Sequence, residues 1–281
     1  MESVSSGLLE AVTAATASAL HEAETSLPPD VNTAIGRALE REEDPTARAQ
    51  LENIRENIHY AGERGLPLCQ DTGVPVIYLT LPPSVPATEA LYDALAEGVR
   101  QATDSVPLRP NVVDPLTREN TTDNTGGGMP AVHLKPGNEL TITVLPKGAG
   151  AENCSRIAML LPSEASEIAR FVAETMLLAG GKPCPPVVLG IGIGATFDGA
   201  AALAKEALLL PIDEMDPFEE EICDAVNALG IGPMGLGGTT TALAVKIKRG
   251  HCHTASLPVA VNVQCWANRR ATRTVEVEKW T

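Results

Sequence analysis

The chain has 281 residues, of which 44% are hydrophobic but only 3% aromatic, and it carries a formal net charge of −15. Its core must therefore be built mainly from Ala, Val, Leu and Ile, and its acidic balance makes nucleic acid an unexpected partner, because phosphate repels such a chain. No apolar run reaches the roughly 18–20 residues that span a bilayer, and the N-terminus lacks the basic segment of a signal peptide. We therefore expect no membrane segment and a cytoplasmic location.

The first 64 residues predict three helices. Leu8, Val12 and Leu20 form one apolar stripe, and Asp30 is placed to cap a second helix. Asp44 followed by Pro45 has the pattern of an N-cap and a first helical residue, which predicts the start of the third.

Helices and strands mix from residue 65 onward. Residues 74–82 predict a strand and 88–103 a helix, whereas 106–130 form a long polar loop that ends in three glycines. Two strand-like runs flank Pro136-Gly137-Asn138 and predict a β-hairpin over 131–148. Further on, we expect helices that begin at Ser163, after residue 194 and at Asp216, and strands over 185–194 and 256–266.

This order favours an α+β fold over a doubly wound sheet. We expect one domain over residues 1–281, with a helical lobe (1–64) and a mixed α/β lobe (65–281) that carries glycine-rich site loops.

Two glycine-rich segments leave alternatives open. GIGIGATFDG (190–199) follows a strand and opens a helix, like a dinucleotide-binding loop, but the next acids, Asp213 and Glu214, follow a helix instead of a second strand. Tight turning of the backbone near a ligand is the favoured interpretation. GLGGTTT (235–241) is either an anion-binding nest of backbone N–H groups or a plain turn.

Three of the six cysteines are candidate metal ligands. Cys69, Cys184 and Cys265 lie at loop or strand ends, whereas Cys223 lies within a helical pattern and is expected to be a buried, small apolar residue. In a reducing compartment such thiols bind metal or do chemistry more often than they form disulfides.

Candidate acid–base and substrate groups accompany them. Gln70 and Asp71 directly follow Cys69, and His253 suits a general acid or proton shuttle. Arg109, between two prolines, is either a carboxylate-binding group or a surface residue. Residues 246–281 hold seven Lys and Arg against two Glu, which indicates either a solvated surface or a positive field for a small anion or a partner subunit.

Long motifs then connect the chain to a known family. GLPLCQDTG, NTGGGMPAVH, the loop with Glu152-Asn153, KPCPPVVLGIGIG, GIGPMGLGGTTTAL and HTASLPVAVNVQCW follow one another in the order found in the class I, oxygen-sensitive fumarate hydratases and L-tartrate dehydratases. The chain resembles the α subunit of their two-subunit form.

That resemblance implies a [4Fe–4S] cluster held by Cys69, Cys184 and Cys265, with one iron that has no protein ligand. It also implies substrate contacts from Gln70, Arg109 and the backbone around Gly150, and an acid–base pair of Asp71 and His253 whose direction is left open. A serine expected before Glu152 is replaced by Ala151, so only the backbone of that loop is assigned a role.

The implied activity is hydration of fumarate to (S)-malate, or the equivalent dehydration of L(+)-tartrate. The chain would act on this small dicarboxylate only with a separate β subunit, in an assembly of two α and two β subunits. Two rival interpretations are a nucleotide-binding redox protein and a non-catalytic iron–sulfur subunit.

Overall fold

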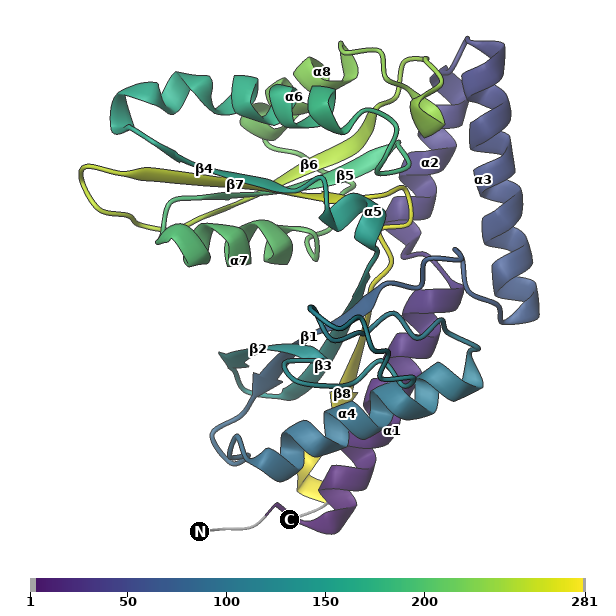
Figure 1. Ribbon diagram of the computed structural model, residues 1–281, viewed down its shortest axis with the longest axis vertical. Helices are drawn as coiled ribbons and strands as arrows, with labels where there is room; N and C mark the ends of the chain where they lie inside the picture. Colours follow the sequence, from purple (N-terminus) through teal and green to yellow (C-terminus); the bar gives the residue numbers. More distant parts are fainter. Residues whose placement is uncertain (1–3, 280–281) are drawn as a thin grey trace. The chain divides into compact units, whose positions relative to one another are not determined.

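The computed structural model describes residues 4–279, which form two compact units that each contain a four-stranded mixed sheet and helices (Figure 1). Unit 1 takes in residues 58–147 and the described parts of 1–27 and 269–281, and unit 2 takes in 28–57 and 148–268. The described residues combine many helices with two mixed sheets, which confirms the predicted α+β class. The lobe boundary at residue 64 stays a prediction, and α1 belongs to unit 1 whereas α2 belongs to unit 2.

The elements of unit 1 are α1 (Ser6–Thr25), β1 (Val74–Leu81), α4 (Glu89–Ser105), β2 (Ala131–Pro136), β3 (Leu140–Lys147), β8 (Ala271–Val275) and the 3₁₀ turn η3 (Val277–Lys279). Those of unit 2 are α2 (Pro29–Arg41), α5 (Ala149–Glu152), β4 (Arg156–Leu160), η1 (Pro162–Glu167), α6 (Ile168–Ala179), β5 (Val187–Ile193), α7 (Phe197–Ala207), α8 (Pro217–Asn227), η2 (Pro233–Gly235), β6 (Ala242–Arg249) and β7 (Leu257–Gln264). The boundary after residue 57 falls within α3 (Pro45–Arg64).

The three N-terminal helices are confirmed, and two of the capping details differ. Asp44 Oδ1 accepts the backbone N–H groups of Thr46 and Ala47 at 2.9 Å, as an N-cap should. Asp30 does not cap α2, because that helix already begins at Pro29; its carboxylate instead accepts the N–H of Ile212 at 2.9 Å. Ser163 likewise caps nothing, since it lies inside η1.

The predicted hairpin over residues 131–148 is wrong in its pairing. Both strands form, but β1 lies between them, so the sheet order is β2-β1-β3-β8. β2 runs parallel to β1 and β3 runs antiparallel to it. The turn at Gly137 crosses the end of β1, where its N–H donates to Leu81 O at 2.9 Å. A local turn signal cannot reveal that an earlier strand is inserted between its two arms.

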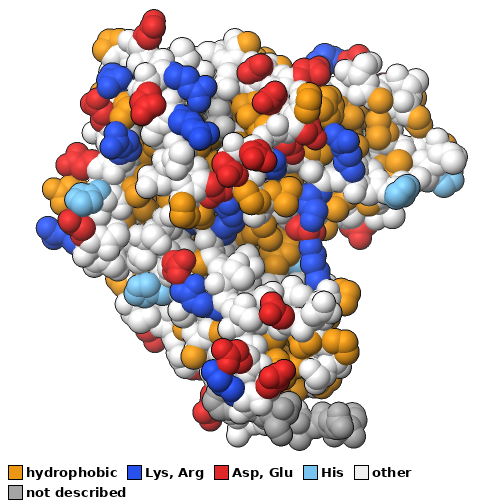
Figure 2. All heavy atoms as spheres, turned by 180° about the vertical axis from the view of Figure 1, so that it is seen from behind, with side chains coloured by type: hydrophobic (Ala, Val, Ile, Leu, Met, Phe, Trp, Pro, Cys, Tyr) orange, Lys and Arg blue, Asp and Glu red, His pale blue; other side chains and the backbone are white. Residues whose placement is uncertain are grey.

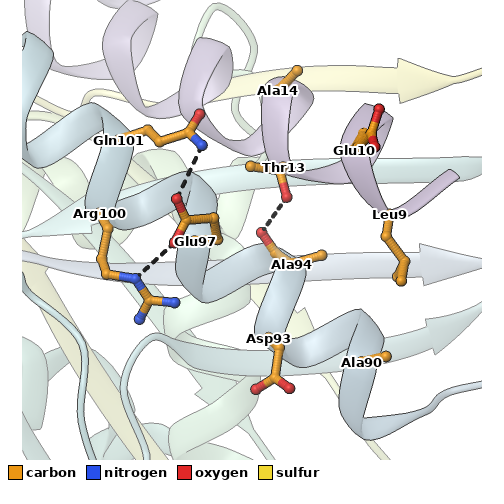
Figure 3. Close-up of a pocket in the computed structure, with 10 residues that line it drawn as sticks. All are labelled: Leu9, Glu10, Thr13, Ala14, Ala90, Asp93, Ala94, Glu97, Arg100 and Gln101. Atoms are coloured by element: carbon orange, nitrogen blue, oxygen red, sulfur yellow. Dashed lines mark hydrogen bonds and ion pairs between the residues drawn. The ribbon is translucent and has the colours of Figure 1, made fainter. Parts of the chain in front are cut away.

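Helices α1 and α4 supply most of the apolar cover for the unit 1 sheet. Leu20 and Val12 of α1 and Leu95 of α4 pack with Ile77 and Ile142 of the strands in one buried cluster. The helices approach closely, and Thr13 Oγ1 donates to Ala94 O at 3.0 Å (Figure 3). The hollow beside this contact has a volume of about 580 Å³ and is lined by acids and alanines from the two helices. It contains none of the predicted site residues.

The sheet of unit 2 has the order β4-β7-β5-β6 and helices on both faces. Helices α6 and α8 cover one face, and α7 covers the other (Figure 1). Along β5 the side chains of Leu189 and Ile191 point into the α6–α8 core, where both are fully buried. The alternate positions, Gly190 and Gly192, face α7.

Those two glycines explain the GIGIG motif. A Cβ on Gly190 would lie 2.1 Å from Ala204 O, and one on Gly192 would lie 2.0 Å from Ala200 O. Only glycine lets the backbone of α7 pack this closely on the strand. The motif therefore serves helix–strand packing, and the interpretation as a tight turn around a ligand is wrong for these two positions. No helix within residues 4–279 is long and apolar enough to cross a membrane.

Candidate functional site

The predicted residues of unit 1 gather around one loop, residues 66–73, which we call the Asp71 loop. Within it Gln70 is exposed, and Cys69 and Asp71 are half-buried. The loop turns into β1 at Gly73, whose φ is +70° and whose added Cβ would lie 2.6 Å from the backbone of Lys147. Gly73 N donates to Asp71 Oδ1 at 2.9 Å. Glycine is thus required at the residue that orients the Asp71 carboxylate.

Arg109 is held directly against this loop. Its backbone N–H donates to Thr72 Oγ1 at 3.2 Å, although the two residues are 37 positions apart in the sequence. The Arg109 side chain is exposed. The structure therefore places the backbone of Arg109 next to the segment that carries Gln70 and Asp71.

Two asparagines that we did not single out complete this arrangement. Asn111 Nδ2 donates to Thr72 Oγ1 at 3.2 Å and to Gly73 O at 2.8 Å. Asn124 is buried, and its side chain accepts the N–H of Asn111 at 2.7 Å and donates to Arg109 O at 3.0 Å. Asn124 has a φ of +61°, which asparagine tolerates better than other side chains. The sequence signal for this role is the position of Asn124 at the start of the glycine-rich segment NTGGG.

Cys184 and Cys265 lie on neighbouring segments of unit 2. The N–H of Trp266 donates to Cys184 O at 3.3 Å, which ties the residue after Cys265 to Cys184. Cys184 is exposed and has a φ of +55°, an unusual backbone conformation for a residue with a side chain. Strain of this kind is concentrated at functional sites.

A second glycine-rich loop supports the segment that carries Cys184. A Cβ on Gly235 would lie 2.5 Å from Gly181 Cα, so the two backbones are in direct contact. Met234 N donates to Pro185 O at 2.8 Å. The loop around GLGGTTT therefore holds residues 180–186 in place.

The loop 235–241 binds the carboxylate of Glu42. Glu42 is buried at the end of α2, and its Oε2 accepts the N–H of Thr239 at 2.9 Å and the hydroxyl of Thr239 at 3.0 Å. Burial raises the pKa of Glu42, but these donors and the N–H of Asp44 lower it more, so the net pKa lies below its usual value. The loop therefore binds an anion through one backbone N–H and one hydroxyl group, and that anion is the internal carboxylate of Glu42.

Gly150 lies beside the Cys184 segment. It belongs to the short helix α5, and a Cβ there would lie 3.3 Å from Lys182 O. Gly150 also lines a cavity of about 370 Å³ to which Arg156 and Lys182 contribute positive charge. Unit 2 thus brings Gly150, Cys184 and Cys265 together.

His253 is not part of this group. It lies in the loop between β6 and β7, and Cys184 and Cys265 lie at the other end of the sheet, where β5 begins and β7 ends. The eight residues of β7 separate the two ends by about 25 Å. His253 is exposed, and its Nδ1 accepts the N–H of Ala255 at 3.1 Å. In the neutral imidazole the proton is therefore on Nε2.

Cys223 differs from the candidate ligands in the way that its helical position predicts. It is buried in α8, and burial raises the pKa of its thiol to about 11. Such a thiol is a poor metal ligand, because the thiolate is the binding form. Neither unit brings three His, Cys, Asp or Glu side chains together as a metal site within residues 4–279.

The basic segment 246–281 does not act as one positive field. Six of its seven Lys and Arg are in ion pairs with acids of other segments or of the same turn. On the face shown in Figure 2, basic and acidic side chains are interspersed. These cations are therefore paired individually with acids, and two of them, Lys246 and Arg269, are buried. The paired residues are Lys246, Lys248, Arg249, Arg269, Arg273 and Lys279.

Comparison with known proteins gives consistent relatives. The family model of fumarate hydratase (Fumerase) matches residues 13–274. A Methanocaldococcus jannaschii protein provisionally named L(+)-tartrate dehydratase subunit alpha is 46% identical, over 92% of this chain and 95% of its own length. The L(+)-tartrate dehydratase subunit alpha of Escherichia coli K12 is 32% identical, over 90% and 87%.

One relative is longer than this chain, which matches only part of its length. A Geobacillus stearothermophilus protein, provisionally named class I fumarate hydratase, is 36% identical over 92% of this chain but only 55% of its own length. The match to the family model includes the Asp71 loop, both cysteine segments of unit 2 and His253. The chain belongs to the class I fumarate hydratase family, which includes the L(+)-tartrate dehydratase α subunits.

Proposed function

We propose that this chain is the α subunit of an oxygen-sensitive iron–sulfur hydro-lyase that interconverts fumarate and (S)-malate, and that it acts in the cytoplasm with a separate β subunit, in an assembly of two α and two β subunits. The observation that carries the proposal is the family match over residues 13–274, which spans every predicted site residue. The grouping of Gln70, Asp71 and Arg109 in unit 1 supports it.

L(+)-tartrate is the second candidate substrate. Relatives that are 46% and 32% identical carry the name of that dehydratase α subunit. Both substrates are small dicarboxylates, and both reactions break or form a C–O bond next to a carbon that loses or gains a proton.

The thiols present fit an iron–sulfur cluster. Soft thiolates are the ligands that such clusters use, and Cys184 and Cys265 lie on hydrogen-bonded segments with one exposed and one half-buried side chain. Cys69 would supply the third ligand from unit 1. When bound, a [4Fe–4S] cluster with one iron that has no protein ligand supplies a Lewis acid, next to which hydroxide leaves more easily.

The chain's own residues bind and orient the dicarboxylate. The guanidinium of Arg109 presents parallel N–H donors to one carboxylate. Gln70 and the backbone of Gly150 donate or accept further hydrogen bonds, and Arg156 and Lys182 make the cavity beside Gly150 attractive to an anion.

Proton transfer is assigned to Asp71 and His253. Dehydration removes a proton from one carbon and hydroxide from its neighbour, and hydration reverses both steps. One group must therefore accept the carbon-bound proton, and the other must donate a proton to the departing hydroxide, which leaves as water. The N–H of Gly73 fixes one oxygen of the Asp71 carboxylate, and the neutral His253 holds its proton at Nε2.

His253 can act on the substrate held near Cys184 only if a second copy of the chain provides it. The length of β7 separates the two ends of the sheet within one chain. A second α subunit therefore follows from this role, which supports the assembly with two α subunits.

The nucleotide-binding rival has lost its main support. The space beside Gly190 and Gly192 is filled by α7. The non-catalytic rival predicts a fully ligated cluster that is stable in air.

The experiment is to reconstitute the chain with iron and sulfide without oxygen, add purified β subunit, and follow fumarate loss and oxaloacetate formation from tartrate. Activity on either substrate that needs the β subunit and is lost in air supports the proposal, and the faster reaction identifies the substrate. Full activity of the α chain alone, or an air-stable cluster without activity, contradicts it.

A further inference from the structure

A buried ion pair lies beneath the Asp71 loop. Glu24, in the last turn of α1, and Arg269, just before β8, are 0% and 1% exposed, and Arg269 Nη1 lies 2.9 Å from Glu24 Oε2. Both belong to unit 1, although they come from opposite ends of the chain. In the sequence Arg269 was considered only as part of the basic segment 246–281, and Glu24 was not singled out. Neither has a part in the proton transfers proposed above.

Glu24 and Arg269 each form a hydrogen bond with a backbone atom of the Asp71 loop. Arg269 Nη2 donates to Asp71 O at 2.6 Å. Glu24 O accepts the N–H of Leu68 at 2.8 Å. The two contacts fall on either side of Cys69 and Gln70, so the backbone of Glu24 holds one end of this segment and the side chain of Arg269 holds the other.

Stability alone does not account for these charges. Both oxygens of Glu24, and Nε and Nη1 of Arg269, are buried without a well-directed hydrogen bond among the described residues. Burial raises the pKa of Glu24 to about 7, although Arg269 lowers it. Replacing a buried ion pair of this kind by apolar residues of similar size is often neutral or stabilising.

What apolar residues could not reproduce is the contact with Asp71 O. An arginine held by a carboxylate presents its remaining N–H groups in a fixed direction, and here one of them ends on the backbone of the proposed acid–base residue.

We propose that Glu24 and Arg269 are positioning residues that set the geometry of Cys69, Gln70 and Asp71 for the hydro-lyase reaction. The role in catalysis rests on the function proposed above. The role in fixing the loop does not, because it concerns contacts within unit 1 only.

The test uses a double variant, E24M/R269M, which removes both charges together and leaves neither one buried and unpaired. The matched control is E22M/R273M, which removes the neighbouring, exposed ion pair between the same two segments. A third variant, R269K, keeps the charge but cannot reach both the carboxylate and Asp71 O.

The first readout needs neither cluster nor substrate. In the metal-free α chain, alkylation of Cys69 by iodoacetamide is followed by mass spectrometry, with Cys184 of unit 2 as the internal reference. We expect E24M/R269M to raise the rate at Cys69 by about tenfold through local opening, with Cys184 and the melting temperature unchanged. The control should match the wild type, and R269K should lie between them.

The second readout is kcat of the reconstituted assembly with β subunit. A misplacement of about 1 Å in a reacting group can cost on the order of 100-fold, so we expect a loss of that size in E24M/R269M and partial recovery in R269K. Wild-type reactivity of Cys69 in a folded E24M/R269M variant would overturn the proposal. If the wild-type assembly proves inactive, the function fails, and the alkylation rates still decide whether the pair fixes the loop.

Discussion

Replacing Glu42 by Gln should destabilise unit 2 and loosen the loop that supports Cys184. The carboxylate accepts two hydrogen bonds from Thr239 and one, at 3.2 Å, from the N–H of Asp44. An amide keeps one acceptor oxygen and turns an NH₂ group toward the remaining donor. A hydrogen bond to a charged group contributes roughly 1.5–3 kcal/mol, and a buried, unsatisfied N–H costs about 1–3 kcal/mol.

We therefore expect E42Q to lose about 2–4 kcal/mol of unfolding free energy, measured by urea denaturation with circular dichroism. The matched control is E43Q, because Glu43 is the next residue, is exposed, and should change stability by no more than about 0.5 kcal/mol. Hydrogen exchange should speed up over residues 235–241 in E42Q alone. A stability within 0.5 kcal/mol of the wild type, with unchanged exchange, would refute the assignment of Glu42 as the anion of this loop.

The same variant has a pH signature. Since the pKa of Glu42 lies below its usual value of 4.5 in the folded chain, the folded form holds the proton less tightly than the unfolded form. The stabilisation is present above pH 4.5 and is lost as the pH falls through the folded pKa. The difference between wild type and E42Q should therefore shrink in acid.

Five further variants have defined outcomes. G73A should lower stability by about 1–3 kcal/mol in urea and reduce activity, because the new Cβ meets Lys147 at a backbone that requires a positive φ. G192A should cost a similar roughly 1–3 kcal/mol by forcing α7 off the sheet, without changing iron content. C223S should keep the iron and sulfide of the reconstituted chain, whereas C184S should lose them, by direct analysis of both elements. Burial raises the pKa of Glu24 to about 7 in the folded chain; the charge of Arg269 opposes this rise, and that of Asp71 adds to it. The free energy of unfolding should therefore fall as the pH rises from 4.5 through 7. In E24Q this pH dependence, measured by the midpoint of urea denaturation, should disappear.

The sequence predicts elements well where the signal is local. Asp216 and Glu219 form the capping box that starts α8, and Thr88 caps α4 through the N–H of Leu91, as their positions before apolar periodic runs indicate. Strands β4, β6 and β8 are not among the predicted elements. In β6, Lys246 and Lys248 interrupt the apolar pattern. Lys246 is buried, with its Nζ donating to Glu219 Oε2 at 2.8 Å and to Glu214 O at 2.7 Å.

The pairing of strands could not be predicted, because it depends on segments that are distant in sequence. The turn at Pro136-Gly137 has the chemistry of a hairpin, yet the strand that pairs with both arms is β1. Turn residues determine where the chain reverses and do not determine which strand it then meets.

In the candidate site, too, residues within local motifs could be predicted, and residues that act through distant contacts could not. The resemblance identifies the residues that would touch substrate or metal, because they lie in long motifs. It does not identify Glu24 or Asn124, whose side chains act by holding other segments. Glu24 lies in an amphipathic helix, where an acid is ordinarily on the solvated face, and only the arginine supplied from residue 269 explains its burial.

The glycines of the family motifs have separate structural reasons, and these bear on how the proposed thiol ligands can be held. Gly73 turns the Asp71 loop against Lys147, Gly190 and Gly192 admit α7, and Gly235 touches Gly181 beside Cys184. In each case one backbone packs directly on its neighbour. A contact made through long side chains would allow more movement, because those side chains can rotate. Thiol ligands need positions fixed to a fraction of an ångström, and backbone contact with a rigid sheet or helix is a direct way to supply such positions from loops. Gly73 and Gly235 therefore serve the loops that carry Cys69 and Cys184, and a Cβ at either position should disturb the neighbouring cysteine before it unfolds the unit.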